Sequence, residues 1–410
     1  MGSCSFSLPF QVSQTPTLLY FFLPLHSRYL LLWNPSGYAF LRGTASLGIN
    51  YGQVGNNLPA PETVLHLLAS VKLTKVRIYD TNPQILSAFS NSSVELIVTV
   101  ENQMLSTLAN PQKAFQWVNA RIMPFIPATR ITGIAVGNEV FSGGEAAFLG
   151  DLMPAIVSIH GALTQLGVDK LIQVSTPNSL AVLASSYPPS SGAFKNEVST
   201  IMLQLLNFLS RTNSPFWINA YPYFAYKDSP NEVSLDYVLL NKNAGMIDPY
   251  TKLPYDNMLY AQVDAVTFAI ARMGFYNIEV RVSETGWPSR GDPEEVGATV
   301  ENAAVYSRNL LRRQLDNEGT PLRPNSKLDV YLFALFNEDM KSGPTSERNY
   351  GLYQPNCTMV YNVGLAALSS SSSSTSSASV AIPSAATKDK RLGLLSWACL
   401  TLLTFRALGR

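Results

Sequence analysis

The stretch ITGIAVGNEV, residues 131–140, begins as an apolar run and ends in glycine, asparagine, glutamate and valine. A short apolar run with β-branched residues and no helical period predicts a buried β-strand. A helical pattern follows at residues 151–167, and a second apolar run follows at residues 171–177. A strand, a helix and a further strand in this order predict a parallel β-α-β unit.

The same unit recurs on both sides of this stretch. Eight strand and helix repeats predict an α/β protein whose parallel sheet closes into a (β/α)₈ TIM barrel. An open doubly wound sheet is the alternative, although no GxGxxG motif follows the first strand. The expected strands span residues 46–52, 75–80, 94–100, 131–140, 171–177, 215–224, 277–287 and 328–339. The expected helices span residues 61–73, 111–122, 151–167, 258–274 and 298–315.

The composition of the 410 residues excludes several classes of protein. Hydrophobic residues make up 46% and charged residues 14%, so the chain can bury a large core. A net charge of +1 gives no electrostatic basis for binding nucleic acid, and it suits a neutral substrate. The three cysteines are not spaced as a zinc site or a disulfide framework, and HExxH is absent. We therefore expect no metal and no cofactor, and we expect a monomer.

The two ends of the chain have the composition of processing signals. Residues 1–45 are rich in Leu, Phe and Tyr but interrupted by proline and arginine, which favours a secretory leader over a membrane span. Residues 369–384 form a serine-rich stretch that predicts a disordered stalk. Residues 385–410 hold a polar spacer and a short apolar tail, which predict a glycosylphosphatidylinositol (GPI) attachment signal at Ser384.

These signals predict a secreted protein on the outer face of the plasma membrane or in the cell wall. Contact with the membrane is then expected only through the lipid anchor. Asn91 and Asn356 begin N-glycosylation sequons, whereas Pro35 excludes the sequon at Asn34. Residues 46–368 remain as the globular (β/α)₈ domain of the mature chain.

Most of the expected strands end in polar or aromatic residues. In a parallel barrel all these ends meet at one face, where active sites are built. The insertion at residues 227–256 follows the sixth strand, and we expect it to form a wall of the cleft. The residues at the strand ends are Tyr51, Tyr79, Asp80, Glu101, Asn102, Asn138, Glu139, Asn178, Tyr221, Tyr223, Glu284, Asn337 and Glu338.

Two of these residues, Glu139 and Glu284, end the fourth and the seventh strand. A carboxylate at the end of a buried strand is costly to desolvate, so it usually has a function there. Two carboxylates that face one cleft are the minimum equipment for cleaving a glycosidic bond. A buried ion pair is the alternative for Glu139. On the residues alone, the two carboxyl groups are interchangeable.

Alternation along the seventh strand predicts which side chains share the inner face with Glu284. Val280 and Val282 have its parity, so we expect them to point inward. Arg281 and Glu279 then face the helices. Beyond the strand, Trp287 has two interpretations, a stacking platform for a sugar ring or simple packing. Glu338 and Lys341 likewise form either a structural ion pair or a charged pair that contacts sugar hydroxyls.

Several motifs together resemble plant family 17 glycoside hydrolases, the endo-1,3-β-glucanases. They are GINYGQVGNNLP (48–59), VRIYDTNP (76–83), GIAVGNEV (133–140), NAYPYF (219–224), VSETGWPSRG (282–291) and LFNEDMKSGPTSERNYGLY (335–353). The resemblance implies a (β/α)₈ barrel, retention at the anomeric carbon, Glu139 as proton donor and Glu284 as nucleophile. It also implies that the cleft contains Tyr51, Tyr79, Asn138, Tyr221, Trp287, Glu338 and Lys341.

The expected function is retaining endo-hydrolysis of 1,3-β-glucan such as callose, with that polysaccharide as the partner. Two alternatives stay open. A 1,3-β-glucan transglycosylase would use the same residues, and a non-catalytic glucan-binding wall protein would not require both glutamates. Preferred chain length, tolerance of branches and biological role have no signal in these residues.

Overall fold

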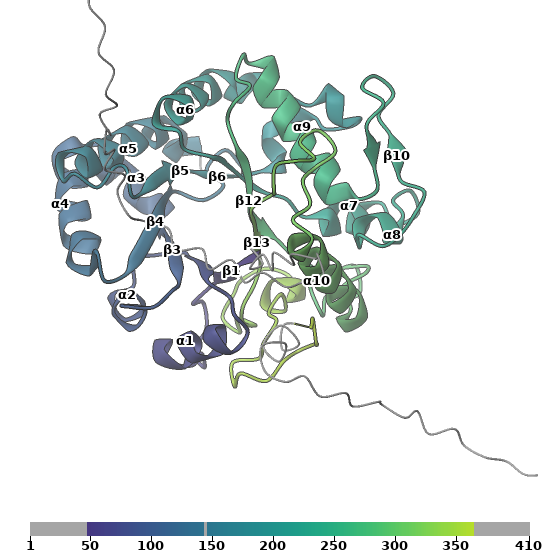
Figure 1. Cartoon of the computed structure of the whole chain (residues 1–410), viewed down its shortest axis with the longest axis horizontal. Coiled ribbons are helices and arrows are strands. Elements are labelled where there is room, and N and C mark those ends of the chain that lie inside the picture. Colours follow the sequence, from purple (N-terminus) through teal and green to yellow (C-terminus); the bar gives the residue numbers. More distant parts are fainter. Residues whose placement is uncertain (1–46, 143–145, 365–410) are drawn as a thin grey trace, which may run out of the picture.

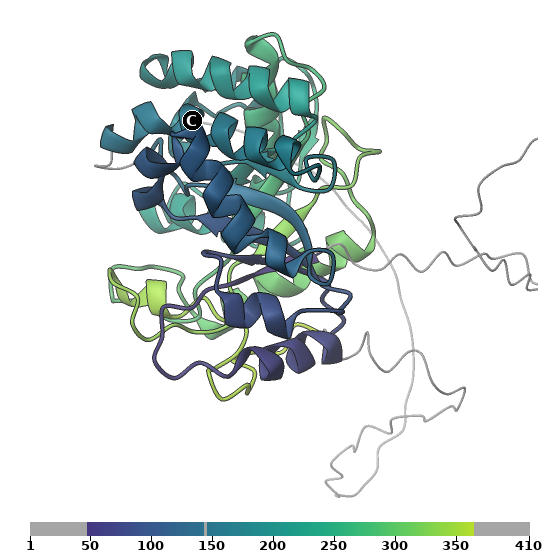
Figure 2. The same cartoon turned by 90° about the vertical axis from the view of Figure 1, so that its left-hand side faces the viewer.

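The computed structural model describes residues 47–142 and 146–364, which form a barrel of parallel strands surrounded by helices (Figures 1 and 2). The leader, the serine-rich stalk, the propeptide and Ser384 lie outside the described residues, and these assignments stay predictions. Within the described part of the chain, none of the helices has both the length and the apolar character needed to cross a membrane.

The wall of the barrel is a parallel sheet with the strand order β5-β4-β3-β2-β1-β13-β12-β9-β6. Only Thr176 separates β5 from β6; β5 pairs with β4 and β6 pairs with β9, so this single stretch closes the ring. The predicted (β/α)₈ barrel is confirmed. The strands are β1 Leu47–Tyr51, β2 Lys75–Ile78, β3 Glu95–Val100, β4 Arg130–Val136, β5 Gln173–Ser175, β6 Pro177–Ser179, β9 Phe216–Asn219, β12 Val280–Thr285 and β13 Val330–Leu332.

Helices cover the outside of this sheet. They are α1 Pro61–Ser70, α2 Pro83–Ala88, α3 Leu105–Leu108, α4 Pro111–Arg121, α5 Ala146–Gln165, α6 Ser199–Thr212, α7 Pro222–Asp228, α8 Leu235–Val238, α9 Met258–Arg272 and α10 Val300–Leu315. Short 3-10 helices are η1 Asn102–Met104, η2 Met123–Phe125, η3 Leu180–Val182, η4 Pro189–Ser191, η5 Asn196–Val198 and η6 Thr345–Arg348. Two small hairpins pair β7 Leu183–Ser185 with β8 Ala193–Phe194, and β10 Met246–Ile247 with β11 Pro254–Tyr255.

The helix boundaries follow local chemistry. Asn110 and Asn257 accept a backbone N–H of the first turn of α4 and α9, and Thr299 does the same for α10. Helix α6 was not among the predicted helices, although its buried residues Met202, Leu205, Leu206 and Leu209 have helical spacing. The signal for α6 was therefore present in the sequence.

The inside of the barrel is narrow and partly polar. The cluster Ile97, Ala135, Trp217 and Tyr331 lies there, separate from the large core between sheet and helices. At the amino ends of the strands, side chains from seven strands surround a cavity of about 330 Å³, so they must converge on the barrel axis. Arg281 is one of them. The prediction that Arg281 faces the helices is therefore wrong.

Val280 and Val282 pack in the outer core, because the space between sheet and helices is where apolar side chains lose most contact with water. Val280 and Val282 pair with Phe216 and Ile218 of β9. The next pair is Glu284 with Asn219, so β12 advances by two residues where β9 advances by one. The pairing with β13 shifts at the same place. One extra residue in β12 forms a β-bulge, which lets Glu284 reach the interior although Val282 does not.

Candidate active site

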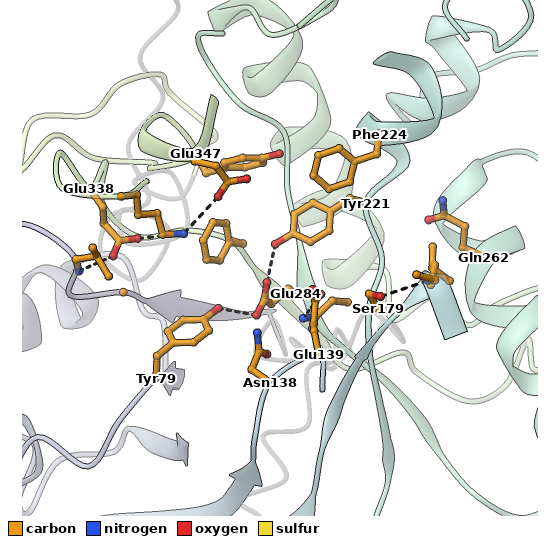
Figure 3. A pocket seen from close by; sticks show the side chains of 18 of the residues that line it. Tyr79, Asn138, Glu139, Ser179, Tyr221, Phe224, Gln262, Glu284, Glu338 and Glu347 are labelled. Atoms are coloured by element: carbon orange, nitrogen blue, oxygen red, sulfur yellow. Dashed lines mark hydrogen bonds and ion pairs between the residues drawn. The ribbon is translucent and has the colours of Figure 1, made fainter. Parts of the chain in front are cut away.

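A cavity of about 660 Å³ lies at the carboxyl ends of the strands (Figure 3). Seven of the nine predicted catalytic and substrate-binding residues line it: Tyr79, Asn138, Glu139, Tyr221, Glu284, Glu338 and Lys341. Lining residues that were not predicted include Gln53, Ser179, Asn219, Phe224, Gln262, Phe333, Glu347 and Tyr350. The strand ends therefore converge as the barrel prediction required.

Glu139 is held by a tight turn after β4. Gly137 has φ +72°, and a Cβ there would lie 2.6 Å from Val140 Cγ2, so only glycine fits. Glu139 itself has φ +53°, in the left-handed region. Its backbone N–H donates to Pro177 O at 2.9 Å, and Asn219 Nδ2 donates to its carboxyl oxygen Oε1 at 2.8 Å. The turn and Asn219 fix the position of this carboxyl group.

The surroundings of Glu139 favour its protonated form. Burial, followed by the negative charge of Glu284, raises the pKa of Glu139 from 4.5 to about 7. Figure 3 shows the two carboxyl groups close together in the cavity. A carboxyl group with a pKa near neutrality can hold a proton and release it in the same pH range, as a general acid must.

Glu284 is surrounded by hydrogen-bond donors. Its Oε1 accepts from Tyr79 Oη at 2.8 Å and from Arg77 Nη1 at 2.9 Å, and its Oε2 accepts from Tyr221 Oη at 2.8 Å. Burial and the charge of Glu284 raise the pKa of both tyrosines well above the ordinary value, so both keep the protons they donate. These three donors orient the carboxylate rigidly (Figure 3 shows both tyrosine contacts).

Arg77 is the main residue that the sequence analysis missed. Its side chain is 0% exposed, and Nη2 donates to Asn138 Oδ1 at 2.7 Å while Nη1 binds Glu284. The guanidinium carbon lies 4.7 Å from the centre of the Tyr79 ring. One buried cation thus connects Glu284 with the residue before Glu139. The sequence did contain a signal for Arg77: it is a charged residue in an apolar strand, and it lies on the same face of that strand as Tyr79.

Glu338, in the segment that follows β13, is bonded to the loop after β1. It is 3% exposed, and its Oε1 accepts from Val54 N at 2.8 Å. A Cβ on Gly52 would lie 2.3 Å from the same oxygen, so this close approach requires glycine. Lys341 Nζ lies 3.8 Å from Glu338 and 3.8 Å from Glu347. Burial is the largest cause of the raised pKa of Glu338. The pair is structural and also faces the cavity.

The structure corrects three predicted contacts. Tyr51, 3% exposed, and Trp287, 1% exposed, lie in the core and do not line the cavity. Trp287 Nε1 donates to Gly297 O at 2.7 Å, and its ring packs between Tyr223 of α7 and Tyr306 of α10. Packing is therefore the interpretation of Trp287 that holds. The third correction concerns the insertion at residues 227–256, which does not line the cavity either.

The wall near α7 comes instead from Phe224 and Ala225, with Gln262 of α9 close by. A helical turn directly after the strand, rather than the long insertion, brings these side chains to the rim. Elsewhere on the molecule, Asn91 and Asn356 are exposed, and Cys357 is a free, partly buried thiol. Among residues 47–142 and 146–364, no group of His, Cys, Asp and Glu is arranged to hold a metal ion.

Comparison with known proteins decides the family. Residues 47–365 match Glycosyl hydrolases family 17. The chain belongs to this family. It is 52% identical over 320 residues to glucan endo-1,3-beta-glucosidase 14 of Arabidopsis thaliana, covering 78% of this chain and 82% of that protein. Glucan endo-1,3-beta-glucosidase 11 of the same plant is 49% identical over 325 residues, covering 79% of this chain and 76% of the relative.

A solved family 17 barrel agrees with the fold. The structure of CJP38, a beta-1,3-glucanase and allergen of Cryptomeria japonica pollen, superimposes with a TM-score of 0.75 at 42% identity. The match covers 78% of this chain and 98% of that one. The predicted membership in family 17 is confirmed, and with it the assignment of this chain as a glycoside hydrolase.

Proposed function

We propose that the protein hydrolyses internal bonds of 1,3-β-glucan with retention of configuration, with Glu139 as the general acid and base and Glu284 as the nucleophile. The observation that carries the proposal is the contrast between two carboxyl groups in one cavity. Glu139 has a pKa of about 7, whereas Glu284 is held by Arg77 and two tyrosines. Two carboxyl groups in opposite environments can take the acid and the nucleophile roles.

In the first step, an oxygen of Glu284 attacks the anomeric carbon and forms an ester bond to it. The bond from that carbon to the bridging oxygen breaks, and Glu139 gives its proton to this oxygen, so the first product leaves as an alcohol. In the second step, Glu139 takes a proton from water while the water oxygen attacks the anomeric carbon. The ester bond breaks, Glu284 recovers its negative charge, and the second product is released.

The walls of the cavity suit a neutral polysaccharide. Phe224, Phe333 and Tyr221 provide aromatic surface, and Asn138, Gln53 and Gln262 provide amide groups that can bind hydroxyls. The relatives described above carry the names of 1,3-β-glucosidases of the endo type. Together these observations favour 1,3-β-glucan as the substrate.

The test is digestion of a linear 1,3-β-glucan by the native protein and by Glu284→Gln. We expect internal cuts and a β-anomeric product at early times by NMR, and sugar release lost in the variant. Unchanged sugar release by Glu284→Gln would contradict the role of this residue. An α-anomeric first product would contradict retention, and products longer than the starting chains would favour the transglycosylase alternative.

We further propose that the enzyme acts outside the cytosol, anchored by GPI. The order of segments at the two ends supports this, as do the exposed sequon residues Asn91 and Asn356. Phosphatidylinositol-specific phospholipase C is expected to release the protein from intact cells. Glycan removal is expected to increase its gel mobility, and Asn91→Gln and Asn356→Gln each to abolish part of that shift. Retention on phospholipase-treated membranes would contradict the anchor.

A further inference from the structure

Ser283 lies at the bulge of β12, directly before Glu284. The register of β12 passes from Val282 to Glu284 while β9 advances by one residue, so Ser283 is the extra residue of the bulge. Its Oγ donates to Asn219 Oδ1 at 2.7 Å, and Asn219 is the residue of β9 that pairs with Glu284. The bulge therefore does more than admit Glu284 to the cavity, because it also brings the Ser283 hydroxyl to Asn219.

Asn219 connects this hydroxyl with Glu139. Its Nδ2 donates to Glu139 Oε1 at 2.8 Å, so the two ends of one amide group bind two different partners. Ser283 and Asn219 are each 2% exposed. Asn219 and Glu139 line the cavity, whereas Ser283 does not. Ser283 therefore lies behind the cavity wall, and it can affect the proton on Glu139 only through other residues.

The orientation of the Asn219 amide decides where Glu139 can hold its proton. An amide nitrogen donates and does not accept, so the Glu139 proton cannot be shared with Nδ2. It stays available for the bridging oxygen of the substrate. With the amide turned over, Oδ1 would face Glu139 and accept that proton in competition with the substrate.

The Ser283 hydroxyl favours the first orientation. It donates to Oδ1, which leaves the N–H end of the amide for Glu139. With the amide turned over, the buried hydroxyl proton would face an N–H group and lose this acceptor, which is costly in a buried site. The backbone of Ser283 is fixed as well, because its carbonyl oxygen accepts from Asn50 Nδ2 at 3.0 Å and from Arg77 Nη1 at 3.3 Å.

We propose that Ser283 is a positioning residue of the reaction, which through Asn219 holds the N–H end of the amide on Glu139 and so keeps the proton of Glu139 available for the substrate. This inference rests on the proposed function, in which Glu139 is the proton donor. The one bulge in β12 then serves both carboxyl groups, since it admits Glu284 to the cavity and orients the amide that binds Glu139.

The electrostatic surroundings of Glu139 make the effect measurable. Burial and the charge of Glu284 raise its pKa to about 7, and the hydrogen bond from Asn219 acts in the opposite direction. Ser283→Ala removes no charge, so a change of the Glu139 pKa in this variant reports on the amide. The charged groups that act on Glu139 are Glu284 of β12, Arg77 of β2 and Glu347 of η6.

The experiment compares Ser283→Ala with Ser175→Ala. Ser175 is the matched control, because it is a buried serine of β5 whose Oγ donates to Pro215 O at 2.7 Å, and it does not line the cavity. In Ser283→Ala we expect kcat/KM on linear 1,3-β-glucan to fall about 10-fold, and its decline with rising pH to move up by at least about 0.5 pH unit. The control is expected to keep the native pH profile.

NMR titration of the Glu139 carboxyl group measures its pKa without substrate. We expect a higher pKa in Ser283→Ala and the native value in Ser283→Thr, which keeps a hydroxyl group. Ser283→Cys, with a weaker donor of similar size, is expected to raise the pKa in the same direction and replaces Ser283→Ala if that variant does not fold. A native Glu139 pKa in the variants without the hydroxyl would overturn the proposal.

Asn219→Ala tests the route from Ser283 to Glu139. In this background, Ser283→Ala is expected to cause no further change of the Glu139 pKa. A further change as large as that in the native background would mean that Ser283 does not act through Asn219, and would also overturn the proposal. If the native enzyme cleaves no 1,3-β-glucan, the proposed function is rejected, whereas the titration still decides whether Ser283 sets the proton affinity of Glu139.

Discussion

The two ends of the barrel interior are both lined by charged side chains, but the charges are balanced at only one end. At the amino end, Lys75 pairs with Asp329 at 2.7 Å, and Arg281 lies 3.5 Å from the same carboxyl group. Arg130 pairs with Glu95 at 2.8 Å. The carboxyl end holds Glu139, Glu284, Glu338 and Glu347, against the cations Arg77 and Lys341.

This difference separates structural charges from functional ones. Where each charge has an opposite partner, the network holds neighbouring strands together. Where carboxyl groups outnumber cations in a buried site, one of them keeps its proton near neutrality, and Glu139 does so with a pKa of about 7. The larger cavity also lies at the end with the excess of carboxyl groups.

The largest contrast is expected in activity. Glu284→Gln removes the charge that attacks the anomeric carbon, and we expect kcat to fall by at least about 1,000-fold. Asp329→Asn removes a carboxylate at the opposite end and is expected to leave kcat within about twofold. Steady-state rates on soluble 1,3-β-glucan measure both. Comparable losses in the two variants would erase the functional distinction between the two ends.

The next contrast is in stability. Arg77→Met leaves the carboxylate of Glu284 buried without its cation, and we expect a loss of about 3–5 kcal/mol in the free energy of unfolding. Arg281→Met acts at the amino end, where Arg281 and its partners reach solvent, and a loss of about 1 kcal/mol is expected. Denaturant unfolding compares them. A larger loss of unfolding free energy in Arg281→Met than in Arg77→Met would contradict this prediction, because it would mean that the charges at the amino end contribute more to stability.

A smaller effect concerns pH. The pKa of Glu139 is about 7 in the folded protein against an ordinary 4.5, so unfolding releases a proton between these values. Stability is therefore lost as pH rises through this window. Glu139→Gln does not show this loss. As pH rises from about 4 to about 8, the free energy of unfolding of the variant therefore increases by about 1–2 kcal/mol relative to that of the native protein. Thermal unfolding at both pH values measures the gain.

The pH profile of activity is an independent readout for the same group. In the native enzyme, kcat/KM is expected to fall as pH rises above about 7, when Glu139 loses the proton it donates. In Glu284→Gln, removal of the neighbouring negative charge lowers the pKa of Glu139, which NMR titration can follow. A Glu139 pKa that does not respond to Glu284→Gln would mean that the two carboxyl groups are electrostatically independent.

The smallest effect is expected at the rim of the amino end. Lys75 and Asp329 form a pair that is partly exposed, with side chains 22% and 18% accessible. Lys75→Met is expected to cost about 0–1 kcal/mol of stability and to leave activity unchanged. Unfolding curves and rates recorded beside those of Arg77→Met give the comparison. A change of KM in Lys75→Met would show that the two ends are coupled.

Much of the fold followed from the sequence because it depends on local pattern. Eight apolar runs predict strands and five helical patterns lie between them, and each of these elements contains its own signal. Glu139 and Glu284 were found in the same way, since a carboxyl group at the end of an apolar run is visible without any knowledge of the fold. The resemblance to the family then assigned the proton donor to Glu139 and the nucleophile to Glu284.

Alternation failed where the strand was irregular. Period-two counting placed Val282 beside Glu284 on the inner face, and the bulge in β12 put Val282 outside and Glu284 inside. A bulge arises from pairing with strands elsewhere in the chain, so the residues of β12 alone do not show it. Tyr51 and Trp287 failed for a similar reason, because burial depends on which helices cover a side chain.

The sequence by itself determined the repeating strand and helix pattern, the polar strand ends and the two carboxyl groups, since each of these is written in neighbouring residues. The tertiary structure alone decided the partners. Arg77 reaches Glu284 across 207 positions of sequence, and Asn219 reaches Glu139 across 80. The pKa of Glu139 depends on such contacts between distant residues, because desolvation and neighbouring charges are set by what surrounds a group in space.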